Sequence, residues 1–147
     1  MKRIFWLSIL CLMPLSAQAS PHDVYGLWVS EAKDGHIEIS DCGDGTPCGK
    51  LVWIDPAKAD TALDLRNKDA GLRARPLLDV PIIWDFKRAK KGWKAGKIYN
   101  PEDGKTFRAR VKAKDADHLQ VKGCLGLICI ANIWTRVAPQ NQITLNN

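Results

Sequence analysis

The sequence has few of the residues that enzymes most often use in catalysis. Histidine occurs three times in 147 residues, at His22, His36 and His118, and each stands beside turn-forming or terminal residues. No serine lies in the Gly-x-Ser-x-Gly setting of a nucleophile elbow. Most carboxylates that draw attention fall in turns, where they bind backbone. We therefore expect no enzyme activity, no metal and no cofactor, with a two-carboxylate hydrolase as the enzymatic alternative left open.

Long apolar runs are absent after the N-terminus. The chain begins Met1-Lys2-Arg3, continues with an apolar run over residues 4–14, and reaches Ala17-Gln18-Ala19, which has the small-x-small form of a signal peptidase site. The run is shorter than the roughly 20 residues of a spanning helix. We expect a signal peptide at 1–19, a single domain at 20–147, no transmembrane segment, and a periplasmic or secreted protein.

Cysteine is sparse but paired. Cys11 falls in the expected signal peptide, and the other four form two close pairs, Cys42 with Cys48 and Cys124 with Cys129. Turn-forming residues and strand-like segments flank each pair, so we expect two local disulfides across hairpins. In "CGDGTPCGKLVW" the Gly-Lys pair precedes leucine, which excludes a phosphate loop, and the cysteine spacing fits a zinc site poorly.

No helical period is sustained anywhere in the expected domain, whereas two-residue alternation recurs throughout. It predicts an all-β fold of eight antiparallel strands, closed as an up-and-down barrel of the calycin, lipocalin-like type, with a two-sheet sandwich as the alternative. One long polar interruption, at about 55–76, is expected to be a loop or a short helix. The predicted strands are residues 24–30, 36–40, 49–54, 77–86, 93–99, 106–113, 118–124 and 129–137.

Gly26 and Trp28 lie on the first predicted strand and Arg136 on the last. This arrangement resembles the calycin signature of lipocalins and fatty-acid-binding proteins, in which the arginine packs across the indole. The segments "GLWVS", "GKIYNPEDGKTF" and "GCLGLICIANIWTR" also resemble a bacterial family of exported proteins catalogued as domain of unknown function number 2147. The resemblance implies a small antiparallel barrel and no known catalytic residues. The chain departs from the family pattern at Asn67-Lys68, where Asn-Pro is more typical. It departs again at Asp79, where glycine is usual and a left-handed backbone is implied.

Charge and tryptophan suggest two binding functions. Residues 66–97 contain ten basic and three acidic side chains, and within this basic lobe Arg73, Arg75, Lys90 and Lys91 are candidates to contact an anionic envelope component. Trp53, Trp84 and Phe107 are candidates to line an apolar pocket.

We therefore expect an exported barrel that binds a small apolar or amphipathic, lipid-like ligand without catalysis. The alternative is a filled structural or interaction barrel of the cell envelope that uses the basic lobe. Nucleic acid is not an expected partner, and the sequence gives no prediction for the oligomeric state.

Overall fold

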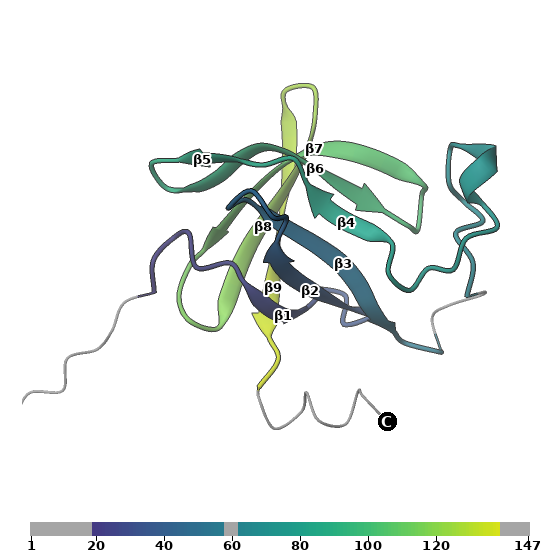
Figure 1. Cartoon of the computed structure of the whole chain (residues 1–147), viewed down its shortest axis with the longest axis horizontal. Coiled ribbons are helices and arrows are strands. Elements are labelled where there is room, and N and C mark those ends of the chain that lie inside the picture. The colour runs from purple at the N-terminus through teal and green to yellow at the C-terminus, as the bar shows by residue number, and fades with distance from the viewer. Residues whose placement is uncertain (1–18, 58–61, 139–147) are drawn as a thin grey trace, which may run out of the picture.

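The computed structural model describes residues 19–57 and 62–138, and the fold of this part of the chain is almost entirely β (Figure 1). Its helical content is one 3-10 turn, η1, at Ala70–Leu72. The strands are β1 (Gly26–Val29), β2 (Gly35–Asp41), β3 (Pro47–Ile54), β4 (Pro81–Trp84), β5 (Lys87–Ala89), β6 (Gly92–Asn100), β7 (Lys105–Ala113), β8 (His118–Leu125) and β9 (Ile128–Arg136).

Eight of these strands form a closed ring. The pairing runs β4-β3-β2-β1-β9-β8-β7-β6, and β4 pairs with β6 to complete the circle. Every pairing is antiparallel. With β5 omitted, neighbours in the ring are also consecutive along the chain, except where β9 pairs with β1. β5 is a short additional strand that pairs only with β6. The predicted all-β, up-and-down barrel is therefore confirmed.

The predicted strand 77–86 and the predicted loop at 55–76 have a more detailed structure than expected. The apolar run yields β4 and then turns at Asp85, whose backbone φ is 60°, before β5 begins. The polar interruption contains η1 and an isolated bridge between Leu63 and Pro76. Residues 58–61 of it lie outside the described part of the chain. Asp79 has φ 66°, the left-handed conformation expected where aspartate replaces glycine.

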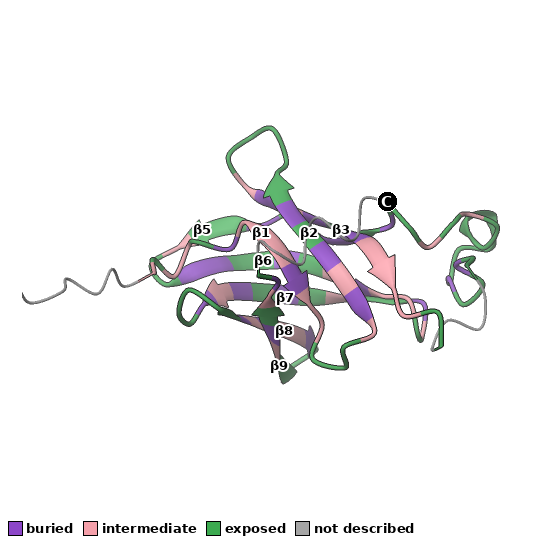
Figure 2. Ribbon diagram, turned by 90° about the horizontal axis from the view of Figure 1, so that it is seen from below, coloured by how far each residue is buried: buried purple, intermediate pink, exposed green. Residues whose placement is uncertain are grey.

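Buried and exposed residues alternate along strands such as β2 and β7, as expected when successive side chains point to opposite faces (Figure 2). On β7 the inner positions are Phe107, Ala109, Val111 and Ala113, and the last three are buried. The core is formed by apolar side chains from most strands around the ring, and burying an isoleucine or phenylalanine fully contributes about 1.5–3 kcal/mol. Its members are Val24, Trp28, Ile37, Ile39, Leu51, Val80, Ile82, Ile83, Phe86, Trp93, Tyr99, Ala109, Val111, Leu119, Val121 and Trp134.

Phe86 occupies the barrel interior because Gly96 leaves space for it. Gly96 pairs with the buried Ala109, so its missing side chain would point inward. A Cβ at Gly96 would overlap the Phe86 ring, so any larger residue there would displace the ring. The aromatic side chains Phe86, Trp28 and Trp134 are each less than 5% exposed, and large rings therefore fill much of this interior.

The connections alternate between the two ends of the barrel, as up-and-down topology requires. We call one end the Trp28 end, where residues 20–25 pass beneath the barrel. Here the Trp93 indole donates to the His22 carbonyl at 3.3 Å, and the Ala113 amide donates to the Pro21 carbonyl at 3.1 Å. We call the other the hairpin end, where the β8–β9 turn projects beyond the neighbouring strands (Figure 1).

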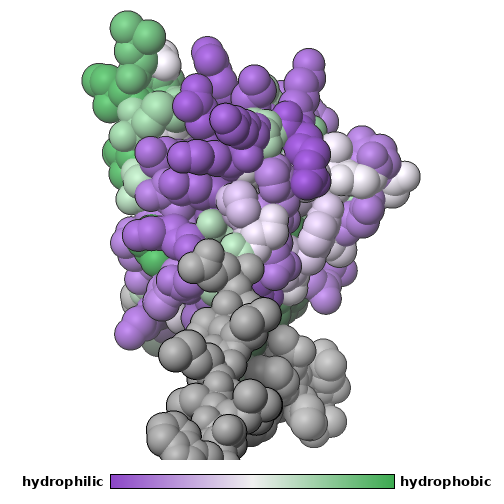
Figure 3. All heavy atoms as spheres, turned by 90° about the vertical axis from the view of Figure 1, so that its left-hand side faces the viewer, coloured by the Kyte–Doolittle hydropathy of each residue, from purple (hydrophilic) through white to green (hydrophobic). Residues whose placement is uncertain are grey.

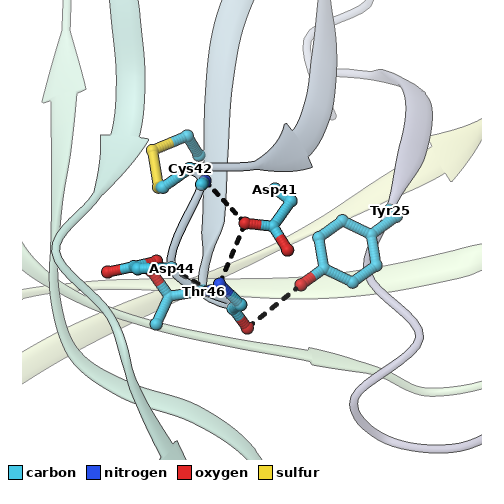
Figure 4. Close-up of a disulfide and its surroundings, with 8 residues drawn as sticks. Tyr25, Asp41, Cys42, Asp44 and Thr46 are labelled. Carbon is cyan, nitrogen blue, oxygen red and sulfur yellow. Dashed lines mark hydrogen bonds between the residues drawn. A yellow bond between two sulfur atoms is a disulfide. The ribbon is translucent and has the colours of Figure 1, made fainter.

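Both expected disulfides are present. Cys42 joins Cys48 across the β2–β3 turn, and Cys124 joins Cys129 across the β8–β9 turn, with Cα atoms 5.1 Å and 4.0 Å apart. In the first turn the Asp41 carboxylate accepts from two glycine amides within 2.9 Å (Figure 4). The stretch that could be read as a phosphate loop is therefore an internally bonded hairpin.

Candidate functional site

The Trp28 end of the barrel is closed by the expected pair. Trp28 is fully buried, and its indole donates to the Val24 carbonyl at 2.8 Å. Arg136 is its cross-strand partner, and the guanidinium carbon lies 4.1 Å from the centroid of the indole. The guanidinium also donates to the carbonyls of Tyr25 at 2.8 Å and Ala116 at 2.6 Å. Arg136 thus connects the first strand, the β7–β8 turn and the last strand.

Gly26 completes this arrangement. Its φ is +120°, and a Cβ there would lie 2.5 Å from an Arg136 guanidinium nitrogen. Only glycine combines this backbone conformation with the close approach of the guanidinium. The three residues of the predicted signature therefore meet at one site, where they close the barrel.

At the hairpin end, the inner face of the barrel continues outward as an apolar surface. Gly123 on β8 faces the side chains of Ile98 and Phe107, with a hypothetical Cβ 3.6 and 3.9 Å from them. Its cross-strand partner is Ile130, which is 71% exposed. Ile98 packs against the core, whereas Ile130 faces solvent. We call Ile98, Phe107, Gly123 and Ile130 the apolar rim.

The seam between the first and last strands ends just below this rim. β1 and β9 pair only through Trp28 with Arg136 and Val29 with Thr135. Beyond them the Glu31 carboxylate lies 3.5 Å from the Ile133 amide, and no described strand pairs with the remaining outer edge of β9. Asn132 is exposed although it pairs with the buried Val121. The barrel wall is therefore incomplete beside the apolar rim.

Of the three predicted lining residues, only Phe107 lies on the inner face. Trp84 follows the inward Ile83 and pairs with the exposed Lys97, so it belongs to the outer face. Trp53 pairs with His36, and their rings lie 4.5 Å apart. These registers place neither tryptophan on the inner face of its strand, although the partly buried Trp84 packs against the core. For Trp53 the reason is a bulge between His36 and Ile37, which reverses the inner and outer sides along β3.

The basic lobe does not form one surface. Lys90 and Lys91 are exposed in the β5–β6 turn, while Arg73 and Arg75 flank η1 at the opposite side of the molecule (Figure 1). Arg73 donates through Nε to the Asn67 carbonyl at 2.9 Å. Arg75 is bound to a buried carboxylate. The four candidates therefore lie in two separate places, and in one of them Arg75 is already paired with the buried Asp64.

A buried polar cluster that sequence reasoning missed fixes the long loop to β6. Asp64 is 1% exposed, and its carboxylate accepts from Asn67 at 2.8 Å, from Arg75 at 2.8 and 2.9 Å, and from the hydroxyl of Tyr99. The Arg75 guanidinium also lies 5.6 Å from the Tyr99 ring centroid. Most of these residues are dispersed in a polar segment without periodicity, and the one sequence signal nearby was the departure from the family pattern at Asn67-Lys68.

This cluster has the character of a structural anchor. Burial, together with the hydrogen bond to Asp64, raises the pKa of Tyr99 to about 12. The phenol therefore stays protonated at physiological pH and is unsuited to act as a general base. Every polar side chain of the cluster has a partner among its members. The arrangement holds residues 62–76 against the barrel and leaves no group directed at a substrate.

The histidines do not assemble into a site. His22 lies 2.7 Å from the Ala89 carbonyl, His118 lies 2.8 Å from the Asp115 carboxylate, and His36 packs on Trp53. Burial lowers the pKa of His36. Among the described residues, no three potential metal-binding side chains come together. In that same part of the chain, no helix is long and apolar enough to cross a bilayer.

Comparison with known proteins agrees with this architecture. A solved structure from Helicobacter pylori, described as a protein that belongs to the lipocalin family, superimposes with a TM-score of 0.71 at 21% identity, covering 85% of this chain and 90% of that one. At this level of identity, the likeness is evidence for a shared fold alone. No curated protein matches the sequence significantly. The family described as uncharacterised proteins conserved in bacteria, DUF2147, matches residues 26–136, and the chain belongs to this family.

Proposed function

We propose that the protein binds a small apolar or amphipathic molecule at the apolar rim and performs no chemistry on it. The observation that carries this proposal is the continuity between the core and the exposed Ile130, through Ile98, Phe107 and Gly123. An acyl chain laid along this surface would cover apolar area now in contact with water, at roughly 25 cal/mol per Å². The polar head of such a ligand would face the exposed Asn132.

The lipocalin-like fold supports a binding role, since barrels of this size and type commonly hold small ligands at one end. The Trp28 end is closed by Arg136 and by residues 20–25, so entry from the hairpin end is the available route. The predicted export and the two disulfides fit a protein that works in the periplasm or outside the cell. The engaged polar cluster around Asp64 supports a role without catalysis.

The decisive experiment is a substitution whose side chain fills the apolar rim. Gly123 has ordinary space for a Cβ beside Ile98 and Phe107, so Gly123→Val should fold and occupy the position of the ligand. A fluorescent fatty-acid analogue should bind the natural protein saturably, with micromolar or tighter affinity, and Gly123→Val should weaken it at least tenfold. Gln120→Val, on the outer face of the same strand, serves as the matched control. Equal binding by all three proteins, or no binding by the natural one, contradicts the proposal.

A second candidate function is an interaction barrel that contacts an anionic envelope component. The observation that favours it is the exposed pair Lys90 and Lys91 in the β5–β6 turn. If this function holds, Lys90→Glu with Lys91→Glu should reduce adsorption to anionic vesicles, and added salt should reduce it further.

A further inference from the structure

The β8–β9 turn carries the most exposed group of apolar side chains in the described part of the chain. Leu127 is 102% exposed, and Leu125, Ile128 and Ile130 are all more than 70% exposed. The hairpin projects at the top of Figure 1, and hydrophobic side chains gather at the upper end of the otherwise hydrophilic face in Figure 3. We call these four residues the apolar tip. Exposed apolar clusters of this kind mark contact with a membrane or a partner.

The apolar tip is held rigidly in this position. Leu125 pairs with Ile128, so the turn contains only Gly126 and Leu127. Gly126 has φ 60°, a conformation that glycine adopts without cost in such two-residue turns. The Cys124–Cys129 disulfide closes the hairpin directly behind them. Little conformational entropy is therefore lost when the apolar tip binds to something.

The strands behind the apolar tip carry only positive charge. β7, β8 and β9 contain no acidic residue, and Arg110 on β7 stands directly opposite Lys122 on β8. Arg108 stands opposite Cys124, beside the turn. Among the described residues none of these three side chains forms a salt bridge. Like charges on paired strands destabilise a sheet. A negatively charged partner would offset this repulsion.

We propose that the apolar tip docks the protein on anionic lipid bilayers, with its side chains inserted and Arg108, Arg110 and Lys122 at the phosphate level. Each basic side chain near an anionic surface adds to the attraction. The inserted turn must keep its free backbone groups hydrated. Insertion is therefore shallow, limited to the interfacial layer in which amphipathic elements lie.

A bilayer fits this surface better than a protein partner does. The apolar tip is a narrow convex projection, and a fluid bilayer accepts it without a complementary pocket. A stable protein interface buries roughly 800 Å² on each partner, more than four side chains at a turn supply. A second copy of the chain would also bring its own Arg108, Arg110 and Lys122 close to these. The apolar tip shares only Ile130 with the proposed ligand site, so the two proposals are separated by variants that change Leu127 and Ile128 on one side and Gly123 on the other.

The test measures partition of the purified protein onto vesicles, by sedimentation, with and without an anionic phosphatidylglycerol fraction. Leu127→Ser combined with Ile128→Ser should weaken binding at least tenfold. Leu78→Ser, at a half-exposed leucine in the loop before β4, is the matched control and should leave binding unchanged. Arg108→Gln with Lys122→Gln should weaken binding to the anionic vesicles only and flatten its salt dependence. The natural protein and all variants are prepared with the same N-terminal residues, so any difference in vesicle binding arises from the substituted residues.

A second measurement locates the contact. Leu127→Trp should bind like the natural protein, and its additional fluorescence should shift to the blue and be quenched by lipids brominated near the headgroup. Three outcomes overturn the proposal. In the first, the serine variant binds vesicles as well as the natural protein. In the second, Lys90→Gln with Lys91→Gln, remote from the apolar tip, abolishes binding. In the third, the serine variant loses self-association in ultracentrifugation while vesicle binding persists, which makes the apolar tip an interface between copies. Gly123→Val, which tests the ligand site, should leave vesicle binding intact.

Discussion

The guanidinium of Arg136 lies 4.1 Å above the centroid of the Trp28 indole and donates to the Tyr25 carbonyl at 2.8 Å. The two residues are cross-strand partners at the seam between β1 and β9. This seam has only two residue pairs, as few as either pairing of β4 and fewer than the other pairings in the ring. The side-chain contact therefore contributes stability where the backbone pairing is short.

Arg136→Ala should lower the free energy of unfolding by about 1–3 kcal/mol, because the indole loses its cover and the carbonyls of Tyr25 and Ala116 lose their donor. Urea denaturation followed by tryptophan fluorescence measures the effect. Arg136→Lys, which keeps the charge but not the planar donor group, should recover only part of the loss. An unchanged midpoint with an unchanged emission spectrum would show that the pair makes no energetic contribution.

Gly26→Ala should be comparably destabilising, although it adds only a methyl group. The new Cβ would lie 2.5 Å from an Arg136 guanidinium nitrogen. The alanine backbone would also have to keep φ at +120°, a conformation that alanine rarely adopts. We expect a loss of about 1–3 kcal/mol in the same urea experiment. Gly43→Ala is an informative comparison, because Gly43 also has positive φ but open space around it. Equal losses would mean that backbone strain alone explains the effect.

Much of the barrel could be predicted from the sequence because strand periodicity and turn residues are local signals. The alternation of "TFRARVKA" correctly assigned the faces of β7, and the cysteines flanking two short turns predicted both disulfides. The faces of β3 could not be predicted, since the bulge at His36 depends on register. The polar cluster was missed for another reason. Asp64 and Tyr99 are 35 residues apart, and only the closed fold brings them together.

Asp64→Ala should be more destabilising than either Arg136→Ala or Gly26→Ala, at about 3–5 kcal/mol. It leaves the buried Asn67 and Tyr99 and the partly exposed Arg75 without their acceptor. Residues 62–76 should then detach from β6, which limited proteolysis with trypsin would detect as cleavage after Arg73. Asp69→Ala, which removes only an exposed cap of η1, is the control. Similar digestion of both variants would contradict an anchoring role for Asp64.

The Cys124–Cys129 disulfide is expected to stabilise the hairpin that carries the apolar tip. Replacing both cysteines with serine should cost roughly 2 kcal/mol, as the chain-entropy relation gives for so short a loop. Hydrogen exchange should quicken at Leu125 and Ile128 more than at Leu119, which is buried at the other end of β8. Uniform quickening along β8 would show that the disulfide stabilises the whole barrel. Non-reducing peptide mapping of the natural protein should also recover only two disulfide links, Cys42 with Cys48 and Cys124 with Cys129.

Tyr99 should make the protein sensitive to alkali through one identifiable group. Burial and the Asp64 hydrogen bond raise the Tyr99 pKa from 10.0 in the unfolded chain to about 12 in the folded protein. The unfolded state therefore releases its proton first, and the stabilisation linked to this pKa difference is complete below about pH 10 and is lost as the pH rises toward 12. Tyr99→Phe removes the titrating group, so the difference in denaturation midpoint between this variant and the natural protein should narrow between about pH 10 and pH 12.

Tyr25→Phe, at a partly exposed tyrosine whose pKa is also raised mainly by burial, provides the comparison for other alkaline titrations. A constant difference between Tyr99→Phe and the natural protein from neutral pH to pH 12 would show that the Tyr99 proton is not coupled to folding.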